Sequence, residues 1–209
     1  MKSVRKSFSA LCCRLSCACL VSLPALAAAA GMSVSQLRCE YRPDPFGIDT
    51  PQPRLSWAVE SEQRSVKQAA YQILVASTGA LVAKDQADLW DSGKVTSDLS
   101  SQVIYTGKPL QSRQFCFWKV KVWTDAGESA TSKPTVWTMG LLNPGDWQAK
   151  WIGSPTATAV EPVPLLRKTF SIDKPILSAI AYVSGLGYYE LSINGKKVGT
   201  HELDPKFTR

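Results

Sequence analysis

The sequence predicts an all-β protein in which one complete β-sandwich is followed by the beginning of a second, jelly-roll-like β-sandwich. Apolar and polar residues alternate with a period of two along most of the chain, which is typical of strands with one buried face. Turn signals such as Asp91-Ser92-Gly93 and Asp125-Ala126-Gly127 separate these stretches at the short spacing of a β-sandwich. With 44% hydrophobic residues in 209, the composition is that of a folded protein rather than a disordered one.

Residues 1–30 are predicted to form a secretory signal peptide. Three basic residues open the chain, an apolar stretch covers residues 15–26, and a run of alanines up to Ala30 supplies a cleavage site before Gly31. The apolar stretch is shorter than the roughly 20 residues that a membrane-spanning helix needs. We therefore expect no membrane span, and we expect release into the periplasm or the medium.

The charge of the chain does not favour a nucleic-acid partner. The formal net charge is +7, but residues 1–30 hold four basic residues and no acidic one. The remainder has 20 basic residues against 17 acidic ones, or +3, and no basic run. Such a small excess lacks the basic patch that nucleic-acid binding requires.

Two cysteines, Cys39 and Cys116, remain outside the predicted signal peptide. Their separation does not match the spacing of metal ligands. In an oxidising compartment they could form a disulfide, but each also lies in an alternating stretch where a buried free thiol is stable. Both interpretations stay open.

The first domain is placed at residues 31–142. Its predicted strands share an alternating apolar face or a short β-branched run, and they cover residues 55–59, 71–75, 102–105, 116–122 and 135–139. We expect Trp57, Trp118 and Val120 to be core residues. The pattern shows little helical periodicity.

Residues 143–164 are predicted to be a linker, which begins with Asn143-Pro144-Gly145-Asp146. The second domain, residues 165–209, has predicted strands at 165–172, 178–184, 188–193 and 196–203. The dipeptide Asn194-Gly195 predicts a type I′ hairpin between the last two. A jelly roll needs about eight strands, so we expect this domain to be incomplete and the chain to be a fragment. The alternative is a small sheet completed by the first domain.

The sequence contains no motif for catalysis, a metal or a cofactor. Its single histidine, His201, does not make a zinc site by itself, and no nucleophile elbow or phosphate-binding glycine loop is present. Close acid pairs such as Glu202 and Asp204 are expected to be solvated strand ends. The remaining functional clue is a group of aromatic residues that one core cannot hold entirely, since exposed aromatic rings stack on sugars: Trp90, Trp123, Trp147, Trp151, Tyr188 and Tyr189.

Three stretches resemble the N-terminal part of bacterial alpha-L-rhamnosidases of glycoside hydrolase family 78. Residues 37–61, LRCEYRPDPFGIDTPQPRLSWAVES, and residues 117–153 resemble the opening and the exit of that family's fibronectin-type-III-like domain. Residues 165–208, with GLGYYELSINGKKVG followed by LDP, resemble the start of the next β-sandwich. The sequence departs from the family at Cys116, where an aromatic residue is commoner.

The resemblance implies membership of a family that hydrolyses terminal alpha-linked L-rhamnose with inversion. Its catalytic carboxylates belong to an (α/α)6 barrel that lies after the end of this sequence, so no catalytic residue can be assigned here. The partners implied are a rhamnose-containing glycan or glycoside and a C-terminal catalytic domain, on which the second domain is expected to pack.

If the second domain binds sugar, Tyr188, Tyr189 and Asp204 are the residues to test, because Asp204 ends a predicted strand where binding loops gather. The alternative for the two tyrosines is that one packs inward and one covers a domain contact. For the whole chain, the alternatives are a stand-alone carbohydrate-binding β-sandwich protein and an adhesion or scaffolding protein. The genomic sequence after codon 209 would discriminate among them.

Overall fold

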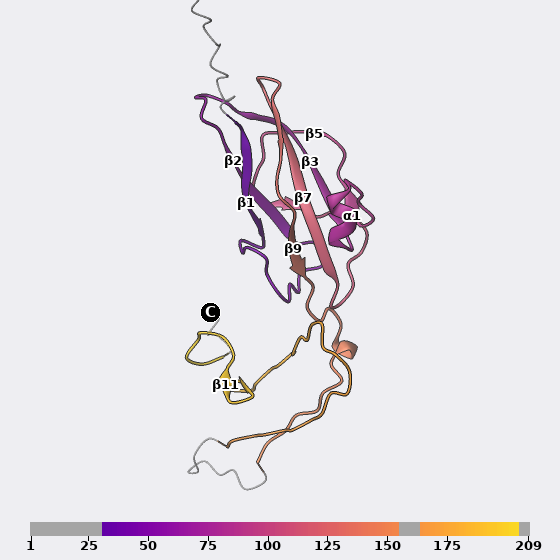
Figure 1. Cartoon of the computed structure of the whole chain (residues 1–209), viewed down its shortest axis with the longest axis vertical. Helices are drawn as coiled ribbons and strands as arrows, with labels where there is room; N and C mark the ends of the chain where they lie inside the picture. The colour runs from indigo at the N-terminus through magenta and orange to yellow at the C-terminus, as the bar shows by residue number, and fades with distance from the viewer. Residues whose placement is uncertain (1–30, 155–163, 205–209) are drawn as a thin grey trace, which may run out of the picture. The chain divides into compact units, whose positions relative to one another are not determined.

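The structure is a computed structural model that describes residues 31–154 and 164–204 (Figure 1). The predicted signal peptide, the middle of the predicted linker and residues 205–209 lie outside the described residues. The chain divides into two compact units, Met1–Ala149 and Lys150–Arg209, which are described separately below.

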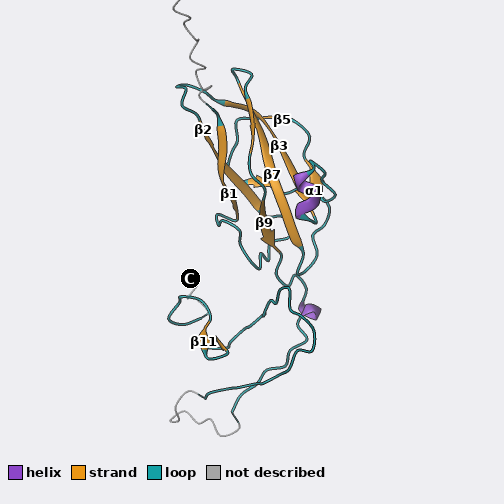
Figure 2. Ribbon diagram, in the orientation of Figure 1, coloured by secondary structure: helices purple, strands orange, loops and turns teal. Residues whose placement is uncertain are grey.

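The first unit is a sandwich of two antiparallel sheets (Figure 2). One sheet has the order β1-β2-β6, with β1 at Ser33–Cys39, β2 at Arg54–Glu60 and β6 at Val103–Ile104. The other sheet has the order β4-β3-β7-β8, and β5 and β9 pair with β3 and β7. Its strands are β3 (Gln68–Ala76), β4 (Trp90–Asp91), β5 (Val95–Thr96), β7 (Phe115–Thr124), β8 (Ser129–Thr131) and β9 (Thr135–Thr138). The predicted all-β class is confirmed.

The core lies between the two sheets and is built from the alternating residues of β7. Cys116, Trp118, Val120 and Val122 are all buried, as a period of two requires when one face of a strand packs inward. The Trp118 ring packs edge-to-face against Trp137 of β9, with centroids 6.2 Å apart. The prediction of Trp57, Trp118 and Val120 as core residues is confirmed.

A short helix that the sequence pattern did not predict, α1 (Gly79–Ala83), follows β3. The Thr78 side chain caps it by accepting a hydrogen bond from the Leu81 amide, and Val82 is its buried residue. Five residues are too few to display a helical period. Just after the helix, Asp85 pairs with the largely buried Lys119 of β7 at 2.7 Å, so the ammonium has a counter-ion.

In the second unit the predicted hairpin at Asn194-Gly195 is confirmed, but its two strands are much shorter than the predicted ranges 188–193 and 196–203. Strands β10 (Ser192–Ile193) and β11 (Lys196–Lys197) pair antiparallel, and Asn194 and Gly195 have φ of 51° and 75°, as a type I′ turn requires. A short 3-10 helix, η1 (Pro144–Asp146), lies in the predicted linker, at the end of the first unit.

The strands predicted at residues 165–172 and 178–184 are wrong, because these residues pair with no strand. The alternation of apolar and polar residues indicates which face of a strand is apolar. A strand also needs a neighbouring segment whose backbone N–H and C=O groups are free to pair with it. Apolar side chains such as Leu165, Phe170 and Leu177 are exposed here. The jelly-roll-like double sheet and the proposed domain boundaries therefore stay predictions.

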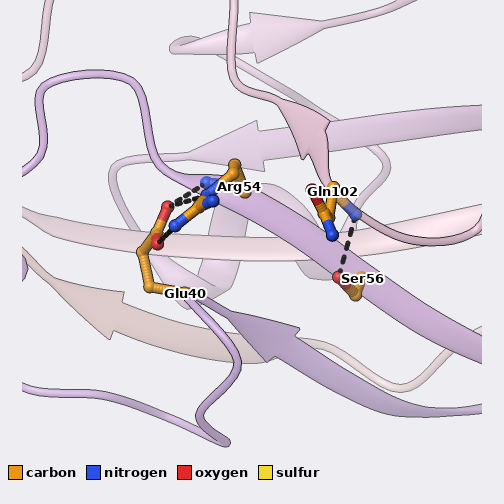
Figure 3. A network of polar contacts seen from close by, with 4 residues as sticks. All are labelled: Glu40, Arg54, Ser56 and Gln102. Carbon is orange, nitrogen blue, oxygen red and sulfur yellow. Dashed lines mark hydrogen bonds and ion pairs between the residues drawn. The ribbon is translucent and has the colours of Figure 1, made fainter.

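The connection from β1 to β2 begins with a strained turn that a charged pair stabilises (Figure 3). Cys39 and Arg42 exchange backbone hydrogen bonds of 3.0 Å around Glu40 and Tyr41, whose φ angles are 46° and 65°. Such left-handed conformations cost non-glycine residues on the order of 1 kcal/mol or more each. The Glu40 carboxylate accepts bonds of 2.6 to 3.2 Å from the Arg54 guanidinium and one of 2.7 Å from the Arg54 amide. These charge-assisted bonds offset the strain.

We expect Glu40→Gln to destabilise the first unit by about 1 kcal/mol at pH 7, a value reduced because Arg54 is partly exposed. The hydrogen bond from Arg54 lowers the pKa of Glu40 from its usual value. The stability from this pair is therefore complete above the pKa of the unfolded carboxyl, about 4.3, and is lost as pH falls through the lowered pKa of the folded state.

Urea unfolding at pH 7, 5 and 3 measures this difference, with the exposed Glu62→Gln as the matched control. The difference in free energy of unfolding between the wild type and Glu40→Gln should decrease toward pH 3. Glu62→Gln should have the stability of the wild type at each pH. A gap that is absent at pH 7, or one that does not change with pH, would contradict the assignment.

Candidate carbohydrate-binding site

The structure brings the predicted residues Tyr188, Tyr189 and Asp204 together next to the β10–β11 hairpin. The Tyr189 amide donates to the Asp204 carbonyl at 2.7 Å, and the Asp204 amide donates to the Tyr189 carbonyl at 3.0 Å. Closer to the turn, the Val198 amide donates to the Leu191 carbonyl at 2.8 Å. The segment before β10 and the segment after β11 therefore run antiparallel, and their pairing positions the three residues.

The two tyrosines have different roles in this geometry. The Tyr189 ring lies against Gly185, where an added Cβ would be only 2.6 Å from the Tyr189 Cδ1 atom, so a larger residue would displace the ring. Tyr188 is 59% exposed. Tyr189 thus packs within its own unit, and Tyr188 is the ring of this pair that can stack on a ligand.

Charged side chains surround this pair. The His201 Nδ1 atom lies 3.1 Å from the Asp204 carboxylate, and Lys197 pairs with Glu190 at 2.9 Å. The hydrogen bond that the Lys197 ammonium donates to the Glu190 carboxylate raises the pKa of Lys197 from its usual value. Sequence reasoning did not assign a role to His201; the only signal was its position three residues before Asp204. The charged groups of both pairs can exchange hydrogen bonds with sugar hydroxyls.

The other aromatic residues singled out in the sequence divide into two groups. Trp90 packs edge-to-face on Tyr105 with centroids 5.2 Å apart, and Trp123 has the ammonium groups of Lys94 and Lys121 within 4.7 and 5.0 Å of its ring. Trp147 and Trp151 are exposed. Trp90 and Trp123 therefore have partners in the protein and are weaker candidates for sugar stacking than Tyr188.

Within residues 31–154 and 164–204 there is no cluster of three or more His, Cys, Asp or Glu side chains that could bind a metal ion. The same residues include no helix with the length and hydropathy of a membrane span.

Two family models match the chain. The Rha78A-like N-terminal immunoglobulin domain matches residues 34–143, and the alpha-L-rhamnosidase N-terminal domain matches residues 174–209. The first match covers the β-sandwich, and the second includes the hairpin with Tyr188, Tyr189 and Asp204. The immunoglobulin and fibronectin-type-III folds share the sandwich architecture that the sequence predicts.

Similar proteins are named alpha-L-rhamnosidase. One from Formosa agariphila is 35% identical in an alignment of 175 positions, which covers 79% of this chain and 19% of the relative. One from Streptomyces avermitilis is 34% identical in an alignment of 196 positions, which covers 83% of this chain and 19% of the relative. This chain thus spans about a fifth of the length of the curated relatives it matches.

Solved structures agree with the sequence comparison. The Streptomyces avermitilis alpha-L-rhamnosidase, solved in complex with L-rhamnose, aligns with a TM-score of 0.57 and 42% identity over 60% of this chain and 12% of its own. The alpha-L-rhamnosidase from Dictyoglumus thermophilum aligns with a TM-score of 0.57 and 34% identity over 59% and 14%. This chain therefore belongs to the alpha-L-rhamnosidase family and corresponds to the N-terminal part of its members.

Proposed function

We propose that this chain supplies the accessory N-terminal domains of an exported alpha-L-rhamnosidase that removes terminal L-rhamnose from glycans or glycosides. The observation that supports this most strongly is the match of residues 34–143 to the N-terminal immunoglobulin domain of these enzymes. Relatives named for this activity are about five times longer than the matched part. Hydrolysis is accordingly assigned to other parts of the whole enzyme.

The second unit is proposed to pack on the catalytic part of the enzyme. Its apolar side chains, including Leu177 and Leu186, are largely exposed among the described residues, and its β10–β11 hairpin is short. A two-stranded hairpin is marginally stable alone in water. Burial against a larger domain would remove this apolar surface from water and stabilise the hairpin.

We expect the 209-residue polypeptide to show no turnover of a chromogenic alpha-L-rhamnoside. The matched control is the same polypeptide extended by the coding sequence that follows codon 209 in the genome, which should be active. Turnover by the 209-residue protein that survives repurification and follows the protein peak would overturn the assignment of hydrolysis to other residues.

Export is proposed from the basic start, the apolar stretch and the alanine run of residues 1–30. We expect protein recovered from the periplasm or medium of an expressing bacterium to begin at or near Gly31. Intact mass and N-terminal sequencing measure this directly. An Ala28→Leu, Ala30→Leu variant, which removes the small residues from the cleavage site, should keep its N-terminus, and an unprocessed wild-type protein in the cytoplasm would contradict the proposal.

Sugar binding by the second unit is proposed from the exposed Tyr188 ring, which lies next to Tyr189 in the segment that pairs with Asp204. We expect Tyr188→Ala to weaken the binding of L-rhamnose by about 1 kcal/mol, the order of magnitude of one aromatic stacking contact, or about fivefold in Kd. Titration of the full chain followed by NMR measures the affinity. Phe46→Ala removes an even more exposed ring from the first unit and should have no effect. Equal affinities for the wild type and Tyr188→Ala would exclude Tyr188 from a binding site.

A further inference from the structure

Two buried thiols face the same core from opposite sheets of the first unit. Cys39 is the last residue of β1, and Cys116 is the second residue of β7. Both are free thiols, fully buried, and members of one hydrophobic cluster. Strand β1 of one sheet contacts β7 of the other, and both strands are labelled in Figure 1.

Backbone hydrogen bonds place the two cysteines at the same end of the sandwich. The register of β7 with β9 sets Cys116 opposite Trp137 and Phe115 opposite Thr138. The loop that follows Cys39 reaches the same strand, where the Thr138 amide donates to the Pro45 carbonyl at 3.0 Å and the Ile48 amide donates to the Thr138 carbonyl at 2.9 Å. These bonds hold the loop that follows Cys39 against β9, in which Trp137 lies opposite Cys116.

We propose that Cys39 and Cys116 form a disulfide that joins the two sheets when the chain folds in an oxidising environment. Such a bond joins two side chains whose backbones approach each other closely, and the two cysteines are buried in one core cluster on strands of facing sheets. The inference does not depend on the rhamnosidase assignment.

The reaction balances with a small disulfide such as oxidised glutathione as the oxidant. One cysteine thiolate attacks a glutathione sulfur, forms a mixed disulfide and releases one glutathione; the second thiolate attacks the protein sulfur of that bond and releases the other. The two thiols lose two protons and two electrons, and oxidised glutathione is reduced to two glutathione molecules.

The folded state should be a poor substrate for this reaction. Burial raises the pKa of Cys116 to about 12, and burial, with smaller effects of the charges of Glu40 and Cys116, raises the pKa of Cys39 well above its usual range. The thiolate is the reactive form, so two buried neutral thiols react slowly. The bond is therefore expected to form during folding, before the core closes.

The test refolds the full chain from urea in a mixture of reduced and oxidised glutathione, followed by alkylation in denaturant, trypsin digestion and mass spectrometry. Trypsin places the two cysteines in separate peptides, residues 39–54 and 114–119, and places the four cysteines of residues 1–30 in others. We expect most of the refolded protein to contain the 39–54 and 114–119 peptides as one cross-linked species. Adding the same mixture to the folded, reduced chain should give at least tenfold less in the same time.

Cys116→Ala is the matched control, in which the cross-linked species must disappear. The oxidised chain should also unfold at higher urea than the reduced chain, because the bond constrains the unfolded state. Fully alkylated Cys39 and Cys116 after oxidative refolding would overturn the proposal. Cross-links mainly to the cysteines of residues 1–30, or an oxidised chain that unfolds at lower urea than the reduced one, would overturn it as well.

Discussion

The first unit depends on the burial of one face of β7. This strand pairs with β3, β8 and β9 and so connects most of its sheet, while its inward side chains supply the centre of the core. The edge-to-face contact of Trp118 with Trp137 lies there, and Trp137 in turn packs on Tyr105. Burying large aromatic side chains contributes several kcal/mol to the stability of the folded state. The second sheet covers these side chains. The turns and caps around the sandwich refine a fold that this burial determines.

The sequence could predict those strands whose own side-chain pattern shows which face is buried. Strands β2 and β7 show a buried face with a period of two, so their side-chain pattern identifies them. Strand β3 is buried on both faces and is identified by its run of apolar residues. Strands β4 and β5, with two residues each, are too short for any period, and they form because β3 offers free backbone groups. The errors at residues 165–172 and 178–184 have the converse cause. Those stretches have the side chains of strands, but no neighbour among the described residues completes a ladder.

The candidate site was predictable to a similar degree. The Asn194-Gly195 turn determines the register of the β10–β11 hairpin, which the pattern predicts. The bridge between Tyr189 and Asp204 lies outside that register, which would place Thr200 opposite Tyr189, so the turn alone does not predict it. The sequence could not assign different roles to the adjacent tyrosines, because alternation places them on opposite sides without stating which side is covered. Gly185 decides this, since its missing side chain leaves the space that the Tyr189 ring fills. The contact between His201 and Asp204 could not be predicted either, because a single histidine does not form a recognisable sequence pattern.

The two units therefore differ in how far their apolar side chains are buried. In the first unit, both sheets find their partner within the chain, and even the strained turn after Cys39 is stabilised locally by Glu40 and Arg54. In the second unit, local interactions are well formed, as the type I′ turn and the Lys197–Glu190 pair show, but the apolar side chains around them stay exposed. Local polar contacts of this kind contribute at most about 1 kcal/mol each at a surface. Stability of the second unit must then come from apolar burial, which supports the proposal that it packs on another part of the enzyme.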